Sequence, residues 1–152
     1  MSPRSVDDVG PAVHALADAI DACTPAPFDA WDAWLDSTRQ NVSQRAFIAI
    51  WRRPWMSLAG DTYGSSLLQH LGTANVFADA TERYPEVALA EVARRRPDVV
   101  LLPSEPYAFN EQHADEIGAA IPGVAIDFVD GRDLFWWGSR TPAAARNLER
   151  PP

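Results

Sequence analysis

Four short apolar runs alternate with stretches of helical periodicity, and this alternation constrains the fold more than any other feature of the sequence. The apolar runs occupy residues 46–51, 75–77, 99–102 and 124–129. The helical stretches follow them at residues 61–71, 89–95, 110–120 and 141–148. Strands that alternate with helices form a parallel sheet covered by helices. The sequence therefore predicts an α/β fold, a four-stranded and mostly parallel sheet with helices on both faces, in a single lobe over residues 45–150.

A separate helical segment, residues 1–44, precedes this alternation. Apolar residues between Val9 and Ile20 recur at the spacing of one helix face. A second amphipathic stretch covers residues 28–42, and Pro25 and Pro27 interrupt the chain between the two stretches. We therefore expect an N-terminal helical segment that stands outside the sheet.

Composition excludes several classes of function. The 152 residues carry a net charge of −8, and all 13 basic residues are arginine. An acidic chain is a poor partner for nucleic acid, and the absence of lysine excludes Schiff-base chemistry and a phosphate-binding P-loop lysine. Cys23 is the single cysteine, so no disulfide forms within the chain. The sequence has no run of 18 apolar residues and no secretory signal, so as written it predicts a cytoplasmic protein.

The histidines show no metal-ligand pattern. His14, His70 and His113 lie far apart, and none has a second histidine at the i, i+4 spacing of a zinc-binding helix. Ser104 and Glu105 with His113 have the residue types of a hydrolase site, but the sequence lacks a Gly-x-Ser-x-Gly turn. We therefore expect no catalysis, no intrinsic cofactor and no metal ion held by the protein itself.

The loops that follow the four predicted strands all carry aromatic side chains. In a parallel sheet these loops meet at one edge, beyond the carboxyl ends of the strands, where open α/β sheets bind ligands. The candidate ligand-binding residues there are Arg52, Arg53, Trp55, Tyr63, Tyr84, Tyr107, Phe109, Trp136, Trp137 and Arg140. Aromatic walls with a few arginines suit a bulky, flat or anionic small molecule. The alternative is that the rings pack on one another or on another segment of protein.

Five short motifs stand in order along the predicted lobe. They are Ile-Trp-Arg-Arg-Pro-Trp-Met at 50–56, Gly-Asp-Thr-Tyr-Gly at 60–64, Asn-Val-Phe-Ala-Asp at 75–79, Tyr-Pro-Glu-Val at 84–87 and Pro-Asp-Val-Val-Leu-Leu at 97–102. With these motifs, residues 45–148 resemble the C-terminal lobe of the binding proteins that serve ABC importers of ferric siderophores, haem and vitamin B12, the helical-backbone metal receptors. Residues 5–44 resemble the helix that links the two lobes of such proteins.

The resemblance implies a ligand cleft between two α/β lobes, of which this sequence supplies one. It implies that Tyr84 and the loop with Arg52, Arg53 and Trp55 contact the ligand, which brings its own metal. It also implies that a surface glutamate docks on the membrane subunit of an importer, and that the protein lies outside the cytoplasm, in the periplasm or at the cell surface. The candidate docking residues are Glu86 and Glu91.

Three functions remain as alternatives. The first is a substrate-binding protein that holds a metal chelate, such as a ferric siderophore or corrinoid, for ABC-type import. The second is a truncated or partner-dependent lobe, whose aromatic edge is an interface for a separate N-terminal lobe. The third is an enzyme that uses Ser104, Glu105 or His113, since an α/β fold does not by itself fix a function.

Overall fold

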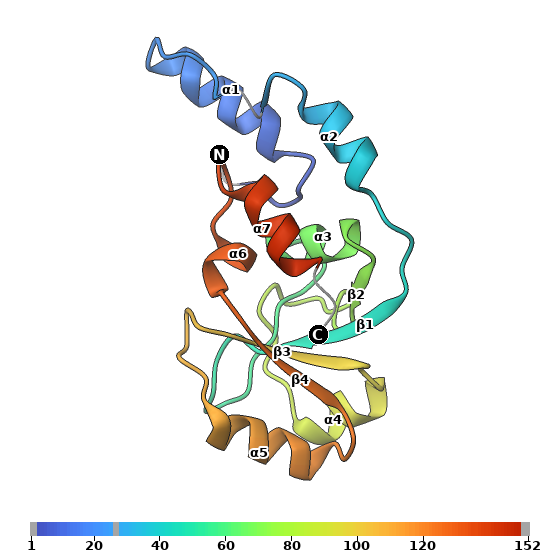
Figure 1. Cartoon of the computed structure of the whole chain (residues 1–152). Coiled ribbons are helices and arrows are strands. Elements are labelled where there is room, and N and C mark those ends of the chain that lie inside the picture. The colour runs from blue at the N-terminus through green and yellow to red at the C-terminus, as the bar shows by residue number, and fades with distance from the viewer. Residues whose placement is uncertain (1–2, 26–27, 150–152) are drawn as a thin grey trace.

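A four-stranded parallel sheet lies at the centre of the lobe in the computed structural model, which describes residues 3–25 and 28–149 (Figure 1). The strands are β1 (Gln44–Ile48), β2 (Thr73–Asn75), β3 (Val99–Pro103) and β4 (Ala125–Val129), in the order β2-β1-β3-β4. Each neighbouring pair is parallel, and Ala46 of β1 is in register with Asn75 of β2 and Val99 of β3. The predicted α/β class and the four-stranded sheet are confirmed.

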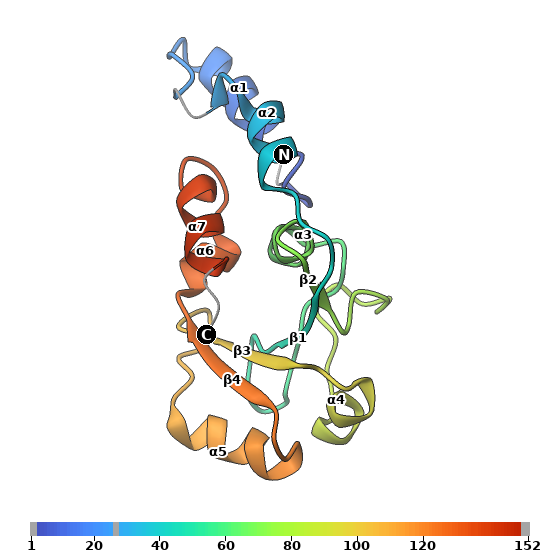
Figure 2. The ribbon, with the colours of Figure 1, turned by 45° about the vertical axis from the view of Figure 1, so that its right-hand side comes forward.

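Helices cover both faces of the sheet (Figures 1 and 2). One face carries α4 (Leu89–Arg95) and α5 (Glu111–Ala120), and the other carries α3 (Tyr63–His70), α6 (Gly131–Phe135) and α7 (Thr141–Leu148). Alternate residues of β1 serve the two faces, as the pleat of a strand requires. Phe47 packs with Val92 of α4 and Ile117 of α5, whereas Ile48 packs with Leu68 of α3 and Leu134 of α6.

The N-terminal segment forms two helices, α1 (Val9–Ala19) and α2 (Trp31–Thr38), which lie beyond α3 and α7 at the top of Figure 1. Phe28, Trp31 and Trp34 stack in a row with ring centroids 4.8 and 4.7 Å apart, and Trp34 stacks in turn on His70 of α3. A Cβ atom at Gly10 would overlap the Trp31 ring, so α1 approaches this stack only because position 10 has no side chain. The segment thereby shares a hydrophobic core with α3 and α7.

Helix α2 is shorter than the predicted amphipathic stretch of residues 28–42. Pro25 lies between the two helices, as expected, and Pro27 lies outside the described residues. The helix ends at Thr38 rather than near residue 42, because the backbone becomes extended at Arg39. There the Gln40 N–H donates to the carbonyl oxygen of His70 at 2.8 Å, which ties the chain to α3 before it enters the sheet.

Other element ends also differ from the prediction. The first strand ends at Ile48 rather than at residue 51, because Trp51 turns back to form an antiparallel bridge with Met56. Thr62, not Asp61, caps α3, and its side-chain oxygen accepts the N–H of the third helical residue. The five-residue helix α6 escaped prediction because it is too short to show a helical period.

Candidate ligand-binding site

The four loops that leave the carboxyl ends of the strands, residues 49–62, 76–88, 104–110 and 130–140, form what we call the carboxyl rim. After β1 the chain enters α3 on one face of the sheet, and after β3 it enters α5 on the opposite face (Figure 1). Because β1 and β3 are neighbours, their loops lead to helices on opposite faces of the sheet, and the point between two such loops is where open α/β sheets bind ligands.

Large aromatic side chains are exposed on this rim. Trp51, Tyr84 and Trp136 are 44%, 52% and 54% exposed. Trp51 of the first loop meets Tyr107 of the third edge to face, with centroids 5.3 Å apart, so this pair joins the loops that follow β1 and β3. The Trp136 indole N–H donates to Glu105 Oε1 at 2.5 Å, which joins the third and fourth loops. Three of the candidate aromatics, Tyr84, Tyr107 and Trp136, thus reach the surface of the rim, with Trp51 as an additional member.

The first loop contains a short hairpin, residues 51–56, which is bonded to Glu116 of α5. The Arg52 guanidinium donates from Nε and Nη2 to the two carboxylate oxygens of Glu116 at 3.0 and 2.7 Å, and Trp55 Nε1 donates to Oε1 at 3.2 Å. These bonds, those from Arg52 first, hold the pKa of the Glu116 carboxyl below its usual value. Sequence reasoning missed Glu116, because a glutamate on a helix gives no sign that it is bound by a loop 64 residues away.

Three candidate aromatics, Trp55, Tyr63 and Phe109, are buried, as in the alternative that the rings pack on one another or on other parts of the protein. Trp55 stacks parallel to Phe109, with centroids 5.8 Å apart, and both rings belong to the core beneath α5. Tyr63 is 5% exposed and bonds to Thr141 Oγ1 at 3.0 Å. Burial raises the pKa of the Tyr63 hydroxyl to about 12. Trp55 and Phe109 therefore support the rim from inside, whereas Tyr63 also lines a small cavity at the rim.

The arginines of the rim divide into paired and unpaired ones. Four of the five lie within 4 Å of a carboxylate, namely Arg52 with Glu116 at 2.7 Å, Arg83 with Asp61 at 3.9 Å, Arg132 with Asp130 at 2.7 Å and Arg140 with Asp133 at 2.6 Å. Arg53 is exposed and forms no ion pair or side-chain hydrogen bond with any residue in the described ranges. The predicted ligand contacts of Arg52 and Arg140 would therefore compete with existing salt bridges.

A small cavity of about 150 Å³ opens on the rim between the second and fourth loops. Its walls include Tyr84, Arg83, Phe135 and Trp137. Trp137 is half-buried, because part of its ring packs on the core shared by α1 and α3. The cavity is smaller than an ordinary small-molecule site, so it suits one ring or side group of a ligand and not a whole chelate.

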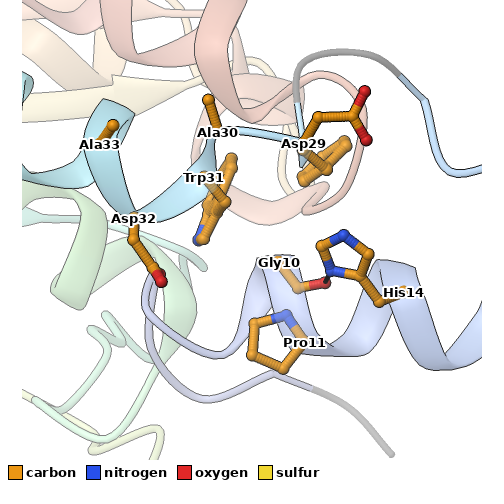
Figure 3. Close-up of a pocket in the computed structure, with 9 residues that line it drawn as sticks. Gly10, Pro11, His14, Asp29, Ala30, Trp31, Asp32 and Ala33 are labelled. Carbon is orange, nitrogen blue, oxygen red and sulfur yellow. Dashed lines mark hydrogen bonds between the residues drawn. The ribbon is translucent and has the colours of Figure 1, made fainter.

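A separate pocket of about 260 Å³ lies away from the rim, between α1 and the start of α2 (Figure 3). His14 faces it and donates from Nδ1 to the Gly10 carbonyl oxygen at 2.9 Å, and Asp29 and Asp32 stand on the opposite wall. The Trp31 ring forms the floor of the pocket but is itself 3% exposed. None of the predicted ligand residues lines this pocket.

The two candidate docking glutamates differ in their surroundings. Glu86 is exposed and forms no salt bridge with any residue that the structure describes. Glu91 forms salt bridges with Arg95, at 2.9 Å, and with Arg94 on its own helix. Hydrogen bonds from Arg95 and Arg94 lower the pKa of the Glu91 carboxyl. Glu86 is therefore the more accessible of the two for a partner.

The residues considered for catalysis do not come together. Ser104 Oγ accepts the Gly131 N–H at 3.1 Å, and Glu105 accepts the indole N–H of Trp136. His113 accepts the Asn110 N–H at Nδ1 and bonds to the Tyr107 hydroxyl at 3.2 Å through Nε2. Each of the three residues is thus engaged with a different neighbour, and no hydrogen bond joins any two of them.

No helix among the described residues has the length and apolar character to cross a bilayer.

No protein-family model matches the sequence, and none of the curated proteins matches it. Solved structures do match the fold. The periplasmic vitamin B12-binding protein BtuF of Vibrio cholerae superposes with a TM-score of 0.72 at 18% identity, over 97% of this chain and 61% of that chain. The periplasmic haem-binding protein RhuT from Roseiflexus sp. RS-1 gives 0.70 at 18% identity, over 97% and 62%. The haem-binding protein BhuT, in complex with two haems, gives 0.73 at 21% identity, over 98% and 63%.

These matches confirm the predicted resemblance at the level of the fold. The chain has the fold of a large part of the periplasmic binding proteins for vitamin B12, haem and iron. It spans about three fifths of the length of these three proteins. Fold alone does not assign a ligand to this chain.

Proposed function

We propose that the carboxyl rim binds a metal chelate, such as a ferric siderophore, haem or a corrinoid, and that the protein delivers it to an ABC importer. The observation that supports this most is that exposed aromatic side chains lie on the loops at the carboxyl ends of the strands, in a fold shared with haem- and B12-binding proteins. The proposed role is binding, without catalysis.

The exposed rings would supply most of the contact area. Tyr84 and Trp136 present aromatic faces to which a flat macrocycle or a catechol ring can stack, and Trp51 with Tyr107 forms a third surface. The metal would arrive inside its chelate, so the protein needs no cofactor of its own.

The importer would recognise a charged surface of the loaded protein. Glu86 is the docking residue we favour, because it is exposed and without a salt bridge to the described residues. A charge at the rim of such an interface mainly raises the association rate and the specificity. Delivery to an importer places the protein outside the cytoplasm, as for the periplasmic proteins it resembles in fold.

Tryptophan fluorescence tests the binding proposal. Titration with haem, cobalamin and a ferric siderophore should quench the emission with at least one of them, and Tyr84→Ala should weaken that binding about tenfold through the lost ring contact. Val42→Ala is the matched control, since Val42 is 49% exposed and lies in the connection before β1, outside the rim. No response to any of the three chelates at high micromolar concentration would contradict the proposal.

A second candidate is a lobe that works only with a separately supplied lobe. An apolar groove of about 660 Å³ runs along α1 and reaches Trp137, and Leu16 in it is 57% exposed. Exposed apolar surface of this kind fits a protein interface. Mass measurement by light scattering distinguishes the candidates, because a monomer that binds a chelate unaided argues against this one.

A further inference from the structure

The pocket of about 260 Å³ between α1 and the start of α2 presents acceptor groups that the described residues leave free (Figure 3). Asp29 and Asp32 line it, and neither carboxylate forms a salt bridge or a side-chain hydrogen bond with any of these residues. His14 donates from Nδ1 to the Gly10 carbonyl oxygen at 2.9 Å, so the Nε2 of a neutral ring is left as an acceptor. The pocket therefore offers acceptors for a ligand that donates hydrogen bonds.

The indole N–H of Trp31 is a donor without an acceptor at the same pocket. The side chain is 3% exposed, and its Nε1 has no hydrogen-bond partner in the described part of the chain. Phe28 and Trp34 stack on the ring, which leaves its edge for other contacts. That edge faces Gly10 in the pocket wall, where a Cβ atom would lie 3.0 Å from Nε1, and Figure 3 shows the nitrogen on the side of the ring toward Asp32. A buried donor without an acceptor is costly, so an oxygen atom supplied from the pocket would be stabilising.

The start of α2 adds backbone donors to this pocket. The first N–H groups of a helix have no partner within the helix. Ala30 is the N-cap residue of α2 and provides no side-chain cap, and it lines the pocket together with Trp31 and Ala33. These N–H groups suit the same ligand oxygen as the Trp31 indole. The pocket therefore combines donors and acceptors over a short distance along the chain.

The charge around the pocket favours a cation. Seven aspartates and no arginine or lysine lie between Ser5 and Thr38 in the sequence. A field of this sign raises the local concentration of cations. No group of three or more side chains that could hold a metal ion occurs among the residues described by the structure, which favours an organic cation. The volume is below the roughly 300 Å³ at which ordinary small-molecule sites begin, so the ligand is small.

We propose that this pocket binds a small primary amine that also carries an oxygen acceptor, the chemistry of an amino alcohol or an amino acid. The ammonium group pairs with Asp29 and Asp32, and the oxygen accepts the Trp31 indole N–H and the free N–H groups of α2. A cation without an oxygen, or an anion without an ammonium group, satisfies only one of the two sets. The pocket is separate from the carboxyl rim, so this proposal does not depend on chelate binding.

NMR titration of the full chain at constant ionic strength tests the proposal through the indole N–H signal of Trp31. Ethanolamine and glycine supply the oxygen as a hydroxyl and as a carboxylate, whereas ethylamine has the ammonium group alone. Ligands of this size bind with a Kd on the order of millimolar. The Trp31 signal should shift with ethanolamine or glycine, and the tighter of the two identifies the preferred oxygen. Ethylamine should bind about tenfold more weakly than that ligand, because it cannot accept the N–H.

Variants with a matched control assign the binding to this pocket. Asp32→Asn should lower the affinity for the preferred ligand about tenfold through the lost charge. Asp36→Asn is the control, since Asp36 is exposed on the same helix, loses the same charge and lies outside the pocket lining. Trp31→Phe keeps an aromatic ring but removes the N–H, so it identifies the signal by its loss and should reduce the preference over ethylamine.

Three results would overturn the proposal. The first is an unchanged Trp31 signal with both ethanolamine and glycine. The second is equal affinity for all three amines, which would mean that the donors take no part. The third is an equal loss of affinity in Asp32→Asn and Asp36→Asn, which would show a general charge effect. None of these results bears on the proposed function, which is tested with metal chelates.

Discussion

The hairpin after β1 and the corner between α6 and α7 each contain a salt bridge between an arginine and a carboxylate, but the two carboxylates differ in exposure. In each, a carboxylate holds an arginine that the sequence suggests for ligand binding. In the Arg52–Glu116 pair the two side chains are 19% and 38% exposed. In the Arg140–Asp133 pair they are 38% and 3% exposed, and Asp133 also accepts Asn147 Nδ2 at 2.9 Å.

The two regions also differ in whether an unpaired arginine lies next to the salt bridge. In the hairpin the adjacent Arg53 remains unpaired, whereas at the corner the neighbouring Arg132 is already bonded to Asp130. The buried carboxylate ties Arg140 into the interior of the α6–α7 corner, whereas the partly exposed one holds Arg52 at the surface of the hairpin. The two pairs therefore differ in how far the carboxylate is removed from solvent.

The largest expected effect is at the buried carboxylate. Asp133→Ala removes the acceptor of both Arg140 and Asn147 and leaves the arginine partly buried without a counter-charge. We expect a loss of about 3 kcal/mol in the free energy of unfolding, measured by urea denaturation. Asp61→Ala, at the exposed pair with Arg83, should cost less than about 1 kcal/mol. Equal losses in the two variants would remove the distinction between buried and exposed pairs.

A smaller effect is expected in the hairpin. Glu116→Ala deletes three hydrogen bonds, but Arg52 can then be solvated, so we expect a loss of about 2 kcal/mol. The pKa of the Glu116 carboxyl is lowered in the folded protein. Its stabilising contribution is therefore full above its ordinary pKa of 4.5 and is lost as the pH falls through the folded value. The free energy of unfolding of Glu116→Ala should therefore fall less steeply with decreasing pH than that of the unaltered protein. An equally steep fall in both proteins would contradict this.

A hydrogen bond between two uncharged side chains, Thr38 and His70, joins the N-terminal segment to the lobe, in contrast to the two salt bridges. His70 bonds through Nε2 to Thr38 Oγ1 at 2.8 Å, and its Nδ1 is buried without a partner among the described residues. Burial first, and the Arg39 charge second, lower the pKa of His70 below 6.5. The folded protein thus favours the neutral ring, and stability should be full above pH 6.5 and decline as the pH falls below it.

Melting temperatures between pH 8 and pH 5, a range of about three units chosen to span ordinary histidine titration, measure this decline. His70→Gln keeps a donor for Thr38 but cannot titrate, so the variant should show a smaller decline than the unaltered protein. An identical decline in both would place the effect at another group.

The smallest expected effect is at the exposed bond of Trp136. Trp136→Phe loses the hydrogen bond to Glu105 but keeps an aromatic ring, and both residues reach solvent. We expect a change below about 1 kcal/mol in unfolding free energy. A larger loss, measured by the same urea denaturation, would mean that the fourth loop is part of the core rather than a surface.

Much of the fold could be predicted because it depends on local patterns. Continuous apolar runs identified β1 and β3, Asn110 marked the start of α5, and Gly72 ends α3 with a φ of +83°. The N-terminal helices followed from their periodicity. Element ends were missed where a tertiary contact decided them, as at Trp51, whose bridge to Met56 ends β1 early.

The site was harder to predict, because membership of a loop does not determine burial. Trp55 and Phe109 lie in different loops and are buried because they stack on each other and pack on the core beneath α5. Arg52 and Glu116 are 64 residues apart, and nothing in either local sequence reveals the pair. The sequence indicated which edge of the sheet to examine, and the tertiary contacts then separated the exposed side chains from the supporting ones.

The central claim is that a metal chelate binds at the carboxyl rim, and the indole N–H signals of the six tryptophans test it most directly by NMR. A paramagnetic ferric chelate broadens the signals of nearby protons. The account predicts that the signals of Trp51 and Trp136 broaden on titration, while those of Trp31 and Trp34 in the N-terminal stack remain sharp. Broadening confined to Trp31 and Trp34, or no broadening with any ferric chelate, would contradict it.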